Sequence, residues 1–112
     1  MRNTIVQVTS YGMGKGDQEL QHKLISKYLT LIQLNNDLPN AIVFYTDGVK
    51  LVVEGSPVLD ELRTLENKGV RLIICSTCLE HYNLLDKVQV GIVGGMTDII
   101  EAQVNAEKVI TL

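Results

Sequence analysis

Short apolar runs alternate with helical patterns along the whole chain, and this alternation constrains the fold more than any other feature. The runs occupy residues 4–8, 41–45, 70–74, 88–93 and 108–112. Strands that are apolar throughout, rather than at alternate residues, are typical of parallel sheets covered by helices on both faces. The sequence therefore predicts an α/β fold, a three-layer α/β/α sandwich with a five-stranded, mostly parallel sheet.

Segments with a helical period lie at residues 17–36, 56–69 and 97–106, each between two of these runs. The segment 56–69 carries its own boundary signals. Ser56 is expected as the N-cap, Pro57 at the first helical position and Gly69 as the C-terminal stop.

The first helical segment is more apolar than a helix on one sheet face requires. At about 100° per residue, its apolar residues cover an arc of roughly 200° around the helix circumference, with Leu34 at one end of the arc and Leu29 at the other. This is about twice the arc that one sheet contact needs. Either a neighbouring loop covers the surplus, or the surplus is a contact between subunits. We favour the subunit contact and expect a homo-oligomer.

Size and charge exclude several classes of protein. A chain of 112 residues, of which 46% are hydrophobic, is long enough for one core, so residues 1–112 are expected to form a single domain. The balance of 10 basic against 13 acidic residues argues against a nucleic-acid partner. No apolar stretch approaches the roughly 18 residues of a membrane span, and the N-terminal residues lack a secretory signal. We expect a cytoplasmic protein with no membrane partner.

The loops that follow the first four predicted strands are all rich in glycine, small hydroxyl residues or thiols. They read SYGMGKGD (10–17), TDGVKL (46–51), CSTC (75–78) and GGMT (94–97). Because ligands bind beyond the carboxyl ends of parallel strands, these loops predict a functional site at one edge of the sheet.

The glycines of the first loop, Gly12, Gly14 and Gly16, offer backbone N–H groups to an anion at the start of a helix. Their spacing matches neither a Walker A loop nor GxGxxG. Asp47 ends the second strand as a ribose-binding acid would, but it lies farther along than the usual ~20 residues. Three interpretations stay open: a tight strand-to-helix turn, a nucleotide site, and a pocket for a small anionic or sulfur-bearing group that would include Thr46.

Both cysteines of the chain, Cys75 and Cys78, stand three residues apart where the third apolar run ends. Cys75 is expected to close the strand and Cys78 to lie in the first turn of a helix, whose N-terminus would lower the thiol pKa. Ser76 and Thr77 supply hydroxyl donors and a candidate N-cap. Four interpretations compete: inert packing, a three-ligand metal half-site with His81, dithiol–disulfide exchange, and sulfur relay through a persulfide. A closed metal site needs four ligands, so we expect no metal and no cofactor.

In order and spacing, the four loops resemble those of the DsrE/DsrF-like family, and most closely the C-terminal domain of YedF-type selenium-metabolism proteins. The similarity runs through GMGKGDQEL, the stretch from LPNAIVFYTDGVK to CSTCLEHYNL, then VQVGIVGGMTDII and AEKVITL. It implies a DsrE-like fold, assembly as a dimer, trimer or hexamer, and a role in sulfur trafficking. In such proteins a cysteine after the third strand receives sulfur as a persulfide and passes it to a partner.

By this resemblance Cys75 matches the sulfur-accepting cysteine, and Cys78 matches the second cysteine of the YedF-like branch. Pocket-forming positions are matched by Gly12, Gly14, Gly16, Gly48 and Met96. Asn83, like Ser76, stands where YedF-like sequences commonly have glycine. The chain lacks the TusA-related N-terminal domain of YedF proteins, so a TusA-like carrier or a cysteine desulfurase is expected as sulfur donor or acceptor in trans.

We therefore hypothesise a cytoplasmic sulfur carrier or sulfurtransferase-like protein. Cys75 would bear the persulfide, Cys78 would resolve or assist, and Ser76, Thr77 and the glycine loop would stabilise the thiolate. This requires that the Cys75 sulfur be ionisable and reachable. The alternatives are a non-catalytic module that binds a small anion or builds an oligomer, and a thiol–disulfide redox protein.

Overall fold

The computed structural model describes all of residues 1–112 and contains one five-stranded sheet in the order β4-β3-β2-β1-β5. Its strands are β1 (Thr4–Val8), β2 (Ala41–Phe44), β3 (Arg71–Cys75), β4 (Ile92–Gly94) and β5 (Lys108–Thr111). Every neighbouring pair is parallel. The predicted α/β fold is confirmed, and the sheet is parallel throughout rather than mostly parallel.

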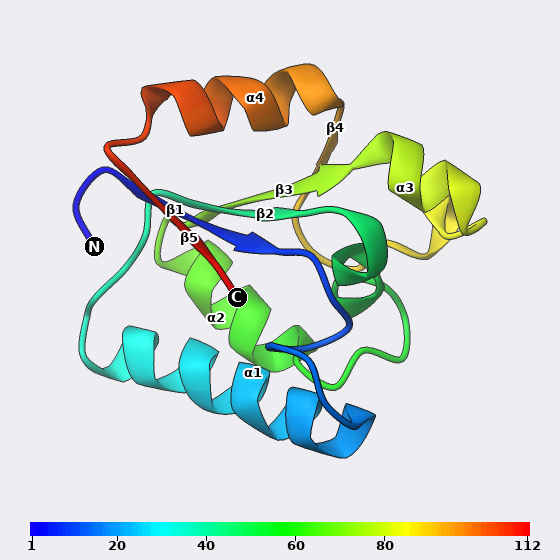
Figure 1. Cartoon of the computed structure of the whole chain (residues 1–112), viewed down its shortest axis with the longest axis horizontal. Helices are drawn as coiled ribbons and strands as arrows, with labels where there is room; N and C mark the ends of the chain where they lie inside the picture. The colour runs from blue at the N-terminus through cyan, green and yellow to red at the C-terminus, as the bar shows by residue number, and fades with distance from the viewer.

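Helices cover both faces of the sheet, as the sequence predicts (Figure 1). One face carries α1 (Gln18–Leu34) and α2 (Leu59–Asn67), and the other carries α4 (Met96–Asn105). Shorter elements stand at the carboxyl ends of the strands: the 3-10 helix η1 (Thr46–Leu51), α3 (Ser76–His81) and the 3-10 turn η2 (Leu85–Lys87). The hydrophobic core lies between these layers.

The helix α4 is fixed to its sheet face by apolar contacts and by one polar network. Ile99 and Ala102 are its buried residues. The buried Gln7 of β1 donates from Nε2 to Thr111 Oγ1 of β5 at 2.9 Å and accepts a hydrogen bond from Gln103 Nε2 of α4. Because a buried amide without partners is costly, this network ties α4 to β1 and β5.

The surplus apolar surface predicted for the first helix is present on the single chain. Helix α1 buries Ile25, Leu29 and Ile32 against the sheet. Four leucines on its outer side stay exposed: Leu20, Leu24, Leu31 and Leu34. No helix of the structure is both long and apolar enough to cross a membrane.

Two predicted element boundaries are wrong. The fourth strand was predicted over 88–93, but β4 is confined to Ile92–Gly94, because Val88 instead makes an antiparallel bridge to Val53 and Gly91 turns the chain at φ +84°. The second helix starts at Leu59 rather than Ser56.

Candidate functional site

The two cysteines lie at the carboxyl end of the interior strand β3 and differ in accessibility. Cys75 ends β3 opposite Gly94 of β4, and Cys78 is the third residue of α3. The side chain of Cys75 is only 1% exposed, whereas Cys78 is half-buried. The expectation that the Cys75 sulfur is reachable is therefore wrong, because the sheet and its covering layer enclose it. Cys78 is the thiol that solvent can reach.

The sulfur of Cys78 has a polar contact. It accepts a hydrogen bond from the Thr46 backbone N–H at 3.1 Å, and the Cys75 thiol is close enough to affect its pKa. Burial first, then the hydrogen bond with Cys75, raises the pKa of Cys78, and the Thr46 amide works in the opposite direction. The predicted lowering of this pKa by the helix N-terminus is thus wrong. An amide that stabilises the thiolate is nevertheless in place.

Thr46 points its amide at Cys78 from an unusual backbone conformation. Its φ is +48°, a left-handed value that β-branched residues rarely adopt. The Thr46 hydroxyl is shared between the carbonyl oxygens of Thr9 and Tyr45, each at 2.7 Å. These bonds join the loops after β1 and β2, and they hold the amide donor where it meets the sulfur.

Gly48 is required because η1 packs directly on the end of β1. A Cβ added at Gly48 would lie 2.0 Å from the Val8 carbonyl oxygen and 2.7 Å from its carbon. No side chain fits at that separation. Gly48 therefore sets how closely the turn that carries Thr46 can approach the sheet.

A second cluster, formed by Asp47, Lys50 and Tyr82, ties η1 to the chain just after α3. The Tyr82 hydroxyl donates to Asp47 Oδ1 at 2.7 Å, and Lys50 Nζ lies 3.1 Å from the same oxygen and 4.6 Å from the Tyr82 ring centroid. The hydrogen bonds from Tyr82 and then Lys50 lower the pKa of Asp47, and the hydrogen bond to Asp47 raises the pKa of Tyr82. Both internal partners bind the same oxygen of this carboxylate, and together they fix the orientation of the Asp47 side chain.

Lys50 and Tyr82 were not predicted as site residues. Tyr82 lies four residues after Cys78, and Lys50 lies three after Asp47; such spacings place two side chains on the same face of a helix. The partner of Tyr82 lies 35 residues away in sequence. Only the folded chain identifies that pairing.

The glycine loop folds back on its own helix. Gln21 of α1 accepts a hydrogen bond from the Met13 N–H at 3.1 Å and donates from Nε2 to the Gly14 carbonyl at 2.7 Å. Gly12 has φ +147°, and a Cβ there would meet Gln21 at 2.5 Å. The loop therefore forms a tight strand-to-helix turn, and none of its hydrogen bonds reaches either thiol.

The remaining predicted residues have few contacts of their own. Cys75 is the N-cap of α3 and Ser76 its first residue, so neither Ser76 nor Thr77 caps the helix. The His81 ring packs edge-on against Tyr82, and no three His, Cys, Asp or Glu side chains cluster as metal ligands. Met96 opens α4 with its side chain exposed. Gly16 lies just before α1, and a Cβ added there would meet only Leu20.

Asn83 explains one departure from the YedF-like pattern. It follows the end of α3 with φ +57°, where the Asn83 and Leu84 amides donate to carbonyl oxygens of the helix. Asparagine is among the few residues other than glycine that favour this left-handed conformation. The helix end is therefore formed without glycine.

The fold and the site define a class: an α/β/α protein with a pair of thiols at the carboxyl end of an interior strand of its parallel sheet. A sequence profile of the DsrE/DsrF-like family matches residues 4–112. The chain therefore belongs to the DsrE/DsrF-like family.

Solved structures share this fold over nearly the whole chain. The ychN protein from E. coli is 19% identical with a TM-score of 0.69, and the match covers 97% of this chain and 98% of the ychN chain. MTH1491 from Methanobacterium thermoautotrophicum is 18% identical with a TM-score of 0.71 and 97% coverage of both chains. BT1422 from Bacteroides thetaiotaomicron is 16% identical with a TM-score of 0.70, covering 98% of this chain and 95% of its own. No curated protein matches the sequence.

We expect the substitution Tyr82→Phe to slow alkylation of Cys78 at slightly alkaline pH. Loss of the bond to Asp47 loosens η1, so the Thr46 amide stabilises the thiolate less and the thiol pKa rises further. A hydrogen bond of this kind is worth about a twofold to tenfold change in rate. Iodoacetamide kinetics measured across pH test this.

Tyr11→Phe is the matched control, since the Tyr11 ring stacks on His22 and its hydroxyl makes no hydrogen bond to the site. Equal slowing in both variants would contradict a specific role for Tyr82.

Proposed function

We propose that this protein carries sulfur as a persulfide and that Cys78 is the accepting thiol. The observation that supports this most is the contrast between a buried Cys75 and a half-buried Cys78 whose sulfur accepts an amide hydrogen bond. The Cys78 thiolate attacks the outer sulfur of a donor persulfide, a Cys78 persulfide forms, and the donor leaves as a thiolate. No external oxidant or reductant is consumed, because one S–S bond replaces another.

In this proposal Cys75 is not needed for sulfur uptake and would act afterwards, as the thiol that resolves the Cys78 persulfide. Its thiol lies close to Cys78, and after burial it is the next cause of the raised pKa of Cys78. This contact also favours a second candidate function, thiol–disulfide exchange. A reversible Cys75–Cys78 disulfide with a measurable reduction potential, in a protein that takes up no sulfur, would establish the second function instead.

The sulfur partner is proposed to be another protein of the cytoplasm, of the TusA-like carrier or cysteine desulfurase class. The YedF-like resemblance of the CxxC stretch supports this, and it leaves selenium as an alternative cargo. Cys78 is half-buried and lies in α3, which follows the carboxyl end of β3, so a donor protein would approach the molecule at this edge of the sheet (Figure 1).

Sulfur loading tests the proposed function. The protein is incubated with a cysteine desulfurase and L-cysteine, or with thiosulfate, and intact mass is recorded. We expect one added sulfur per chain, removable by a reducing thiol. A protein that gains none, and whose thiols react equally fast folded and unfolded, would be a binding or assembly module instead.

We also propose that the exposed leucines of α1 form a subunit contact. The substitution Leu31→Glu places a charge among Leu20, Leu24 and Leu34, so an oligomer built on this face should dissociate. Light scattering at micromolar concentration measures the effect. Gln18→Glu is the control, because it adds the same charge on the opposite side of α1. A monomeric parent protein, or an unchanged mass for Leu31→Glu, rules this face out as the contact.

A further inference from the structure

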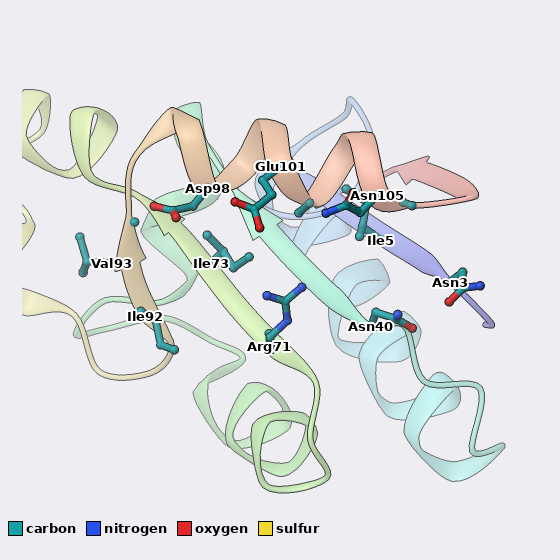
Figure 2. A pocket seen from close by; sticks show the side chains of 13 residues that line it. Asn3, Ile5, Asn40, Arg71, Ile73, Ile92, Val93, Asp98, Glu101 and Asn105 are labelled. Atoms are coloured by element: carbon teal, nitrogen blue, oxygen red, sulfur yellow. The ribbon is translucent and has the colours of Figure 1, made fainter.

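A groove that neither thiol lines lies between α4 and the sheet (Figure 2). It has a volume of about 400 Å³, which is within the range of roughly 300–1,000 Å³ seen for small-molecule sites. It lies between α4, which runs from the end of β4 to the start of β5, and the amino ends of β1, β2 and β3, where Ile5, Asn40 and Arg71 line it.

Two opposite charges face each other across this groove without pairing. Arg71 rises from the start of β3, and Glu101 points from α4 toward the strands (Figure 2). The four ion pairs of the structure lie elsewhere, so the guanidinium and this carboxylate are more than 4.0 Å apart. The other acid of the groove, Asp98, is already engaged, since its Oδ2 accepts the Gly95 N–H at 2.9 Å.

The rest of the lining is apolar, with amides at one end. Ile73 lies between the two charges, and Ile92 forms the side wall on β4 (Figure 2). Ile92 is 66% exposed, a large value for an aliphatic side chain within a sheet. Asn40, beside Arg71, makes no side-chain hydrogen bond within the protein.

This groove is separate from the exposed apolar face of α4. Met96, Ile100 and Val104 lie on one side of the helix, and at about 100° per residue they are centred roughly 120° away from the side that holds Glu101 and Asn105. A subunit or partner docked on that outer face would therefore leave the groove open.

We infer that the groove binds a free α-amino acid with an aliphatic side chain. Its carboxylate pairs with Arg71, which presents a fork of donors to such a group, and its ammonium pairs with Glu101. Its side chain covers Ile73 and Ile92 and removes their exposed surface from water. A ligand with both charges satisfies two groups that the chain itself leaves unpaired.

Calorimetry and NMR titration with L-leucine test this inference on the intact chain. We expect saturable binding, with shifts confined to the methyl groups of Ile73 and Ile92. Three related probes each lack one feature: 4-methylpentanoate lacks the ammonium, 3-methylbutylamine lacks the carboxylate, and glycine lacks the side chain. Each should bind at least about tenfold more weakly, since a lost charged hydrogen bond or buried side chain is worth that much.

Two variants complete the test. Arg71→Gln and Glu101→Gln should each weaken leucine binding about tenfold. Arg63→Gln, on the surface of α2, should leave it unchanged. The inference would be overturned if leucine showed no saturable binding, or if the one-charge probes bound as tightly as leucine. It would also be overturned if the two groove variants changed the oligomeric mass while the parent protein bound no leucine. Because the thiols lie outside this groove, none of these outcomes bears on sulfur uptake.

Discussion

The substitution Cys78→Ala should abolish sulfur uptake, and Cys75→Ala should not. Removing a nucleophile typically costs about 10³-fold or more in rate. Cys75 acts on the reactive thiol through its hydrogen bond and its charge, both of which raise the pKa of Cys78. Without Cys75, more of Cys78 is thiolate at neutral pH, so sulfur uptake by Cys75→Ala should be as fast as in the parent protein or faster. Initial rates of mass gain with thiosulfate measure both.

The opposite pattern would contradict this assignment. If Cys75→Ala loses uptake while Cys78→Ala retains it, the buried thiol is the acceptor and the chain must open before it reacts. Circular dichroism of both variants serves as the control, because Cys75 is enclosed by the core and its truncation leaves a small cavity.

The substitution Gly48→Ala should have the largest effect on stability. Its added methyl group would overlap the Val8 carbonyl oxygen, and backbone on both sides must move to admit it. We expect the free energy of unfolding to fall by about 3 kcal/mol, at the upper end for overpacking. The reactivity of Cys78 should change as well, since η1 would carry Thr46 away from the sulfur. Urea unfolding and alkylation kinetics measure the two effects.

Gly16→Ala is the matched control for this change. A Cβ at Gly16 would meet only Leu20 Cδ2, at 3.7 Å, which is an ordinary contact. Its free energy of unfolding should stay within about 0.5 kcal/mol of the parent protein. Similar losses in both variants would show that close approach to Val8 is not what requires glycine at position 48.

The sheet and its layers were predictable because the burial of a strand determines which types of residue it contains. Strands covered on both faces must be apolar throughout, so runs such as 41–45 mark them without further information. Boundaries were less predictable where tertiary contacts decide. Val88 and Gln89 stand in the same predicted strand as Ile92, but they contact residues 52–53 and do not join the sheet. Ser56 and Pro57 match a helix start, yet the helix begins only at Leu59.

The candidate site was predictable in place but not in detail. The CxxC spacing and the strand end located both thiols, since the loop after a central parallel strand is where ligands bind. Which thiol is exposed depends on what covers the strand tip, and no local pattern records that. The same holds for Thr46, whose amide reaches Cys78 only because its backbone adopts φ +48°.

Peptide mapping of the sulfur-loaded native protein tests the central claim most directly. After brief loading, alkylation of the persulfide and digestion with trypsin, both cysteines fall in the peptide 72–87, between Arg71 and Lys87. Tandem mass spectrometry then assigns the extra sulfur within that peptide. We predict it on Cys78. Extra sulfur found on Cys75, with Cys78 carrying only the alkyl group, would contradict the account.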